Sequence, residues 1–140
     1  WFEYCIRFED LSDGTNTYTY EGGFGDTYAI GTAYGAFGFR YSHGVNGGKF
    51  QLYSKLSTET TADSGITVNA DTFYRLRAVY MPNDTIKYYI NGVYVGTITT
   101  DIPTNRQMGW VNIFTKSAGT TNRTLYTDYM TVAQIGSSLG

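Results

Sequence analysis

Apolar residues recur at every second position where the sequence opens. Phe2, Tyr4, Ile6 and Phe8 alternate with Glu, Cys and Arg, which places the four apolar side chains on one face of a strand. About ten short segments of strand character follow along the chain, separated by turns rich in Gly, Asn, Asp and Ser. No long stretch repeats at the helical period of about 3.6 residues. The sequence therefore predicts an all-β fold, with two antiparallel sheets in a sandwich or jelly roll.

The predicted strands are short, and turn residues set their limits. They cover residues 2–8, 18–20, 24–30, 36–42, 49–56, 66–68, 72–80, 85–90, 93–99, 110–115 and 123–132. Asn91-Gly92 is the strongest local signal, because a two-residue type I′ hairpin needs positive φ at both central positions. Residues 21–23 are predicted to be a turn and 57–65 a polar loop. Residues 1–132 then form one jelly-roll β-sandwich, and 133–140 form a C-terminal tail or linker.

The composition favours strands and narrows the range of partners. The chain holds 14 Tyr, 8 Phe and 17 Gly, and its net charge is −2 with 16% charged residues. With no general excess of basic residues to hold phosphates, we expect no nucleic-acid partner and no strongly acidic substrate. No apolar run approaches the roughly 18 residues that span a bilayer, so membrane insertion is not expected either.

Cys5 is the only cysteine, which excludes an internal disulfide and a thiolate metal cluster. It falls inside the first predicted strand, so we expect a buried, inert thiol. The sequence starts at Trp1 and enters a strand within two residues. We therefore expect a processed product or a piece of a longer protein, whose remainder would determine its localisation.

Several segments resemble a known family of β-sandwiches. They are residues 73–80 (FYRLRAVY), 86–96 (IKYYINGVYVG), 102–103 (IP), 116–120 (KSAGT) and 125–129 (LYTDY). Together they resemble the second half of a concanavalin A-like jelly roll of the laminin G or lectin/glucanase type. With residues 23–26 (GFGD) added, the combination is similar to modules of phage tail-fibre and other virion surface proteins. The resemblance implies a jelly-roll module on a virion surface or outside the cell; a function taken from it is an analogy.

The sequence lacks the acid pair that an enzyme of the glucanase type would need. Such an enzyme carries paired carboxylates on one strand, in the order Glu-x-Asp-x-x-Glu, so that acid and nucleophile enter one cleft. No such string occurs, and nearly all acidic residues lie singly in turns. Asp128 is the exception, and a solvent-facing or hydrogen-bonded strand acid explains it. We therefore predict no catalytic residues.

Metal and cofactor sites are not expected. His43 is the only histidine, which rules out a site with several histidines, and no nucleophile motif accompanies it as a catalytic base. The laminin G resemblance raises the alternative of a calcium ion held by loop carboxylates and carbonyls. The chain lacks the Asp-x-Asp ladder that would make such a site specific.

Exposed aromatic rings beside amides could form a sugar-binding surface, because Tyr and Trp faces stack on pyranose rings. The alternative for any one aromatic is that it fills the core or packs on a sheet face. Tyr89 and Tyr94, on either side of the Asn-Gly turn, are expected to form a cross-strand pair. The candidate ligand-binding residues are Tyr28, Tyr34, Tyr41, His43, Gln51, Tyr53, Trp110 and Asn112.

Arg75 and Arg77 share one strand face beside Lys87 on the next strand. They form either a cationic strip or, as we expect more often, a solvated face balanced by acidic residues across the strands.

The sequence is compatible with three functions. The leading hypothesis is a non-catalytic module on a virion, in a tail fibre or appendage, that binds host glycans or a neighbouring structural protein. The second is a purely structural decoration or assembly domain, covered by another subunit or by a second copy in a homo-oligomer. The third is a glycan-degrading enzyme, which ranks last because the paired acids are missing.

Overall fold

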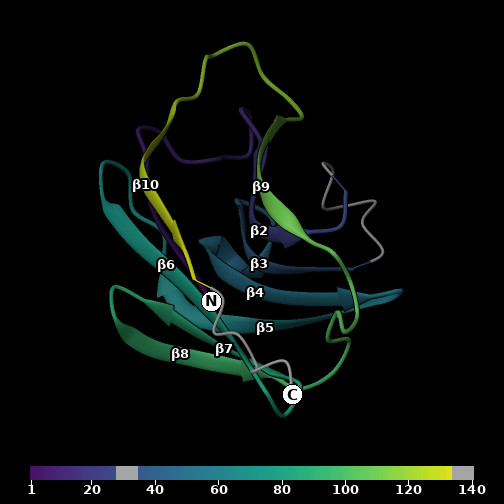
Figure 1. The fold of residues 1–140 in the computed structure, drawn as a ribbon. Helices are drawn as coiled ribbons and strands as arrows, with labels where there is room; N and C mark the ends of the chain where they lie inside the picture. The colour runs from purple at the N-terminus through teal and green to yellow at the C-terminus, as the bar shows by residue number, and fades with distance from the viewer. Residues whose placement is uncertain (28–34, 134–140) are drawn as a thin grey trace.

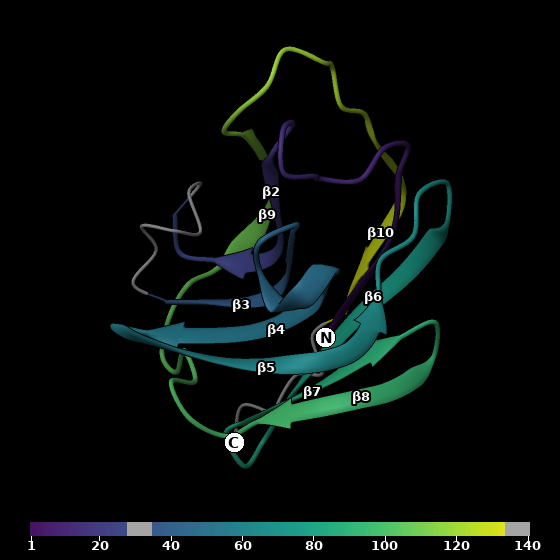
Figure 2. The same ribbon diagram turned by 180° about the vertical axis from the view of Figure 1, so that it is seen from behind.

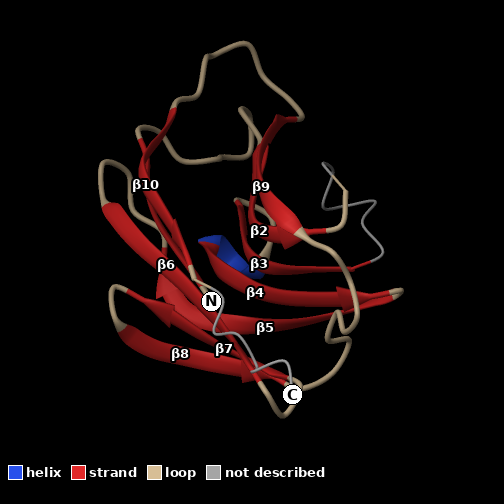
Figure 3. Cartoon of the chain, viewed as in Figure 1, coloured by secondary structure: helices blue, strands red, loops and turns tan. Residues whose placement is uncertain are grey.

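Two β-sheets packed face to face make up the structure (Figure 1). It is a computed structural model that describes residues 1–27 and 35–133. Each sheet has five antiparallel strands, and the described residues contain no helix beyond one 3-10 turn at Asn46–Gly48 (Figure 3). Among those residues, no helix has the length and apolarity to cross a membrane. The predicted all-β sandwich is confirmed.

The first sheet, sheet A, contains both the first and the last strand of the chain. Its order is β10 (Leu125–Val132), β1 (Phe2–Phe8), β6 (Phe73–Met81), β7 (Thr85–Ile90) and β8 (Val93–Ile98). The second, sheet B, has the order β5 (Thr58–Thr67), β4 (Lys49–Leu56), β3 (Gly35–Ser42), β2 (Tyr18–Gly25) and β9 (Gly109–Lys116). The edge strands β5 and β8 lie next to each other where the sheets meet (Figure 2).

The core between the sheets is largely aromatic. The four apolar residues that alternate along β1 point into it and are completely buried, as predicted. They meet rings from sheet B: the ring centroids of Phe8 and Tyr41 lie 5.0 Å apart, and those of Tyr4 and Trp110 lie 4.5 Å apart. Each such side chain contributes about 1.5–3 kcal/mol by burial, and ring contacts add to it.

β2 runs without interruption through residues 21–23, so the predicted turn is wrong. Gly22 and Gly23 stand there because no side chain fits. A Cβ on Gly22 would lie 2.1 Å from the hydroxyl oxygen of Tyr20, and one on Gly23 would lie 2.1 Å from the carbonyl oxygen of Phe37. The strand predicted at 24–30 supplies the end of β2, and residues 28–30 lie outside the described residues.

β5 occupies most of the segment that was predicted to be a polar loop. It pairs with β4 from Thr58 to Thr67, with one irregularity in the register. Side chains on both faces of this edge strand are largely exposed, so the segment lacks the apolar alternation of the other strands. The β-branched threonines nevertheless favour an extended backbone.

The other predictions for the fold agree closely with the structure. Asn91 and Gly92 have φ values of 52° and 82°, as the predicted hairpin requires. The rings of Tyr89 and Tyr94 lie 5.8 Å apart across that hairpin, which confirms the cross-strand pair. Cys5 is 6% exposed, and burial raises the pKa of its thiol, which suits an inert residue.

Candidate functional site

The outer face of sheet B, turned away from sheet A, carries a network of charged side chains centred on Arg40. Arg40 Nε donates to Glu21 Oε1 at 2.7 Å. Its two Nη atoms donate to the two oxygens of Glu59 at 2.9 Å each, a bidentate pair, and Nη1 also reaches Gln51 Oε1 at 3.1 Å. The strand register brings the group together, because Arg40 lies opposite Glu21 on β2 and opposite Gln51 on β4.

Tyr53 lies beneath this network. It is completely buried and packs in one cluster with Ala36 and Val111, and the Arg40 guanidinium carbon is 5.0 Å from its ring centroid. In the strand register Tyr53 stands opposite Gly38, and because glycine has no side chain, there is room for the Tyr53 ring. Burial raises the pKa of its hydroxyl well above 10, and among the described residues that hydroxyl has no hydrogen-bond partner.

The charges in the network hold each other ionised. Burial disfavours the charged form of Arg40, but the hydrogen bonds and charges of Glu59 and Glu21 outweigh that effect and raise its pKa. The hydrogen bond from Arg40 in turn lowers the pKa of Glu59 below 4.5. Glu59 therefore carries no proton to donate near neutral pH. The arrangement presents fixed donors and acceptors rather than an acid and a base.

A hollow of about 300 Å³ opens where β2 ends and β9 begins, and Trp110 and Val111 are among the residues that line it. Gly25 and Gly109 face each other there and supply no side chain to fill the space. Asp26 at its rim accepts hydrogen bonds from the Gly35 backbone N–H at 2.9 Å and from Arg106 at 3.4 Å. A volume of this size admits a small ligand such as one or two sugar rings.

The structure brings together only part of the predicted ligand-binding set. Gln51 and Tyr53 meet at Arg40, although Tyr53 is covered. Trp110 is among the residues that line the hollow, but its ring packs inward against Phe2 and Tyr4. Tyr41 is 2% exposed inside the core, so the prediction that its ring contacts a ligand is wrong. Tyr28 and Tyr34 lie outside the described residues.

His43 and Asn112 lie away from both features. His43 is exposed in the turn after β3, at the opposite end of that strand from the hollow. Asn112 on β9 donates a hydrogen bond to Thr127 Oγ1 on β10 at 3.3 Å, which links the two sheets. Neither is brought to the Arg40 network.

The sequence prediction missed Glu21, Arg40 and Glu59. One signal for Arg40 was present: it is a charged residue inside an otherwise apolar strand, on the side opposite Phe37 and Phe39. Nothing local pointed to its partners. Within the described ranges, no group of three His, Cys, Asp or Glu side chains is placed to hold a metal ion.

A family model described as "SO2946-like, C-terminal domain" matches residues 7–128. The chain belongs to this family. The SO2946-like domain is also similar in structure to a β-glucanase of Bacillus licheniformis, with a TM-score of 0.60 and 15% sequence identity over 92% of this chain and 63% of the glucanase. A structure of sheep galectin-11 in complex with glycerol matches with a TM-score of 0.45 and 11% sequence identity, over 90% of this chain and 88% of the galectin chain.

These likenesses concern the fold. At 15% identity the glucanase shows that the SO2946-like domain has a concanavalin A-like jelly roll, and the chain spans less than two thirds of that enzyme. None of the curated proteins matches the chain.

Proposed function

We propose that this SO2946-like domain is a non-catalytic carbohydrate-binding module and that its binding surface is the outer face of sheet B. The observation that carries the proposal is the Arg40 network beside the hollow. Sugar hydroxyls are recognised by rigid, planar hydrogen-bonding groups next to an apolar surface. Gln51 and Glu59 supply such groups, and the cluster of Tyr53 and Val111 on the same face extends to the hollow. The lectin/glucanase type of fold supports carbohydrate as the ligand class.

The carboxylates of the network do not suit glycoside hydrolysis. Glycosidases keep one carboxyl protonated as the general acid and leave the other free as nucleophile or base. Here one guanidinium binds both Glu21 and Glu59, and it lowers the pKa of Glu59. The similarity to a glucanase supports a shared fold, and the proposal stays with binding.

The proposal includes a setting in a larger particle, on a virion surface or an extracellular appendage. Its support is the resemblance of the sequence segments to tail-fibre modules.

A second candidate is a structural decoration domain, and one observation favours it. Every large hydrophobic residue that is exposed in the described part of the chain lies on sheet A; these are Phe73, Val93, Tyr94, Tyr126, Met130 and Val132. Light scattering separates the two, because a homo-oligomeric structural domain would not remain monomeric.

A glycan array with the labelled domain tests the binding function. We expect Gly109→Leu to lower glycan binding at least about tenfold, because its side chain would enter the hollow, where a Cβ meets no atom within 4 Å. Gly44→Leu is the matched control, since this exposed turn glycine also has open space around it. A folded domain that binds no glycan would overturn the proposal, and release of reducing sugar from β-glucan would overturn its non-catalytic part.

A further inference from the structure

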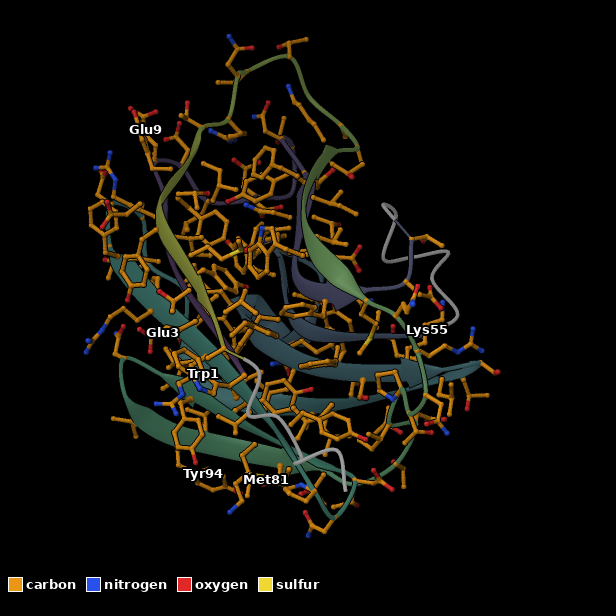
Figure 4. The ribbon with its side chains drawn as sticks, viewed as in Figure 1. Trp1, Glu3, Glu9, Lys55, Met81 and Tyr94 are labelled. Atoms are coloured by element: carbon orange, nitrogen blue, oxygen red, sulfur yellow. The ribbon has the colours of Figure 1, made fainter. Side chains whose placement is uncertain are left out.

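The outer face of sheet A carries three cations on neighbouring strands. Arg75 and Arg77 project from β6 and Lys87 projects from β7, and we call this surface the cationic face. Trp1 and Tyr94 border it (Figure 4). It lies on the opposite side of the sandwich from the Arg40 network, so it is a separate surface.

Within the described residues, none of these three cations forms an ion pair. The ion pairs among the described residues use other basic side chains, and no hydrogen bond in that part of the chain involves a side-chain nitrogen of Arg75, Arg77 or Lys87. Strands β6, β7 and β8 contain no Asp or Glu at all, and the nearest acidic strand residues are Glu3 on β1 and Asp128 on β10. In the strand register Glu3 stands directly opposite Arg77, so one acidic residue does lie across the strands from this face, and β6 to β8 add no other.

Aromatic rings hold part of the face in place. The guanidinium carbon of Arg77 lies 5.0 Å from the Trp1 ring centroid and 5.6 Å from that of Tyr89. Contact with two rings restricts the orientation of the guanidinium. Its Nε is buried without a hydrogen-bond partner among the described residues, so the Nη groups are the ones that can donate to a ligand. Tyr94, 55% exposed, and Phe73, 52% exposed, present apolar ring surfaces on the same sheet.

The spacing of the cations suits an extended, negatively charged chain. Arg75 and Arg77 are two residues apart on one strand, about 6.6 Å, and Lys87 lies opposite Val79, one further step along β6. We propose that the cationic face binds an anionic polysaccharide, with carboxylate or sulfate groups on Arg75, Arg77 and Lys87 and sugar rings against Tyr94 and Phe73. This contradicts the expectation, drawn from the net charge, that an acidic ligand is excluded, because three cations outnumber the one acidic residue, Glu3, that stands opposite them in the strand register.

Other occupants fit the face less well. A second copy of the chain would bring like charges together across a symmetric contact. A nucleic acid would find only three cations on a chain with a net charge of −2. An acidic peptide would satisfy the charges but would make no specific use of the exposed rings.

Binding of labelled polysaccharides at about 50 mM and about 500 mM salt tests the proposal. We expect polygalacturonate or dextran sulfate to bind and neutral dextran not to, with affinity falling at the higher salt concentration; the two polyanions tell carboxylate from sulfate recognition. Arg75→Glu and Lys87→Glu should each weaken binding at least about tenfold. Lys116→Glu on β9 makes the same charge change on sheet B and should leave binding intact.

Further probes separate this proposal from its alternatives. Tighter binding of poly-L-glutamate or of oligothymidylate than of both acidic polysaccharides would overturn the glycan assignment. So would equal losses for Arg75→Glu and Lys116→Glu, since the effect would then be one of net charge. Gly109→Leu, which blocks the hollow on sheet B, should not change polyanion binding, so the two proposals can fail independently.

Discussion

Gly23 and Gly38 face each other across β2 and β3, and the two backbones approach closely there. A Cβ on Gly38 would lie 2.1 Å from the carbonyl oxygen of Gly22, and backbone atoms cannot rotate away as a side chain can. The same absence of side chains leaves room for the Tyr53 ring on the outer face of sheet B. The pair of glycines therefore determines what this face can carry.

Gly38→Ala should lower the free energy of unfolding by at least about 1–3 kcal/mol, because the added methyl group forces β2 and β3 apart. Urea denaturation at neutral pH measures the loss. Gly109→Ala, in β9 with no atom near the added Cβ, is the control and should change stability little. Equal effects of the two substitutions would argue against close strand contact as the cause.

Arg40 is the second residue whose replacement has a clear expected outcome. Arg40→Met leaves the half-buried Glu21 and the more exposed Glu59 without their cation, so we expect a loss of about 1–2 kcal/mol at pH 7. Arg40 lowers the pKa of Glu59, so its stabilising contribution is present above 4.5 and is lost as the pH falls through the folded-state value.

The difference between the native chain and Arg40→Met should therefore shrink on acidification to about pH 3. Urea denaturation at both pH values checks this. A difference that stays constant with pH would show that packing of the Arg40 side chain on Tyr53, rather than its charge, provides the stability.

At the scale of elements, the β7–β8 hairpin shows how a turn fixes the register of two strands. Gly92 has φ of 82°, which an L-residue adopts only with strain. Gly92→Ala should cost about 1 kcal/mol in the free energy of unfolding, measured by thermal or urea denaturation. Gly44→Ala, in the β3–β4 turn at a residue without positive φ, should cost less, and the reverse order would contradict the strain argument.

The elements also show how far the sequence predicts this structure. Alternation in β1, and the Asn-Gly pair between β7 and β8, give strand limits close to those observed, because both signals are local. β2 and β5 were misassigned for opposite reasons. Gly22 and Gly23 look like a turn, yet they are required by contacts with Tyr4 and Phe37, which are distant along the chain, while β5 is exposed on both faces and carries no apolar period.

The candidate site was predictable only where it lies within one strand. Gln51 and Tyr53 are two residues apart on β4, so a shared face follows from strand geometry. Their meeting with Glu21 and Glu59 depends on the order β5-β4-β3-β2, which no local pattern contains. The inward direction of Tyr41, by contrast, was available from the sequence, because it shares the strand face of Phe37 and Phe39.

At the scale of the whole molecule, buried tyrosines make the fold sensitive to alkali. Burial raises the pKa of Tyr4, Tyr53 and Tyr88 well above 10. These hydroxyls stay protonated in the folded chain but ionise near pH 10 when it unfolds. Their contribution to stability is thus complete below pH 10 and is lost as the pH rises beyond it.

We therefore expect cooperative alkaline unfolding somewhat above pH 10, with a simultaneous rise in tyrosinate absorbance. Circular dichroism and ultraviolet absorbance followed on one sample measure both events. The urea-unfolded chain is the control, in which all 14 tyrosines should ionise near pH 10. Complete ionisation with an intact circular dichroism spectrum would contradict the burial of these hydroxyls.

The position of β1 between β6 and β10 has a consequence for biosynthesis. β1 leaves the ribosome before either of its neighbours, since β6 starts at Phe73 and β10 starts at Leu125. Pairings between such distant segments form slowly. A nascent chain must therefore expose the apolar face of an unpaired β1 until β10 has been synthesised, and such exposed apolar strands are the segments that chaperones shield from aggregation.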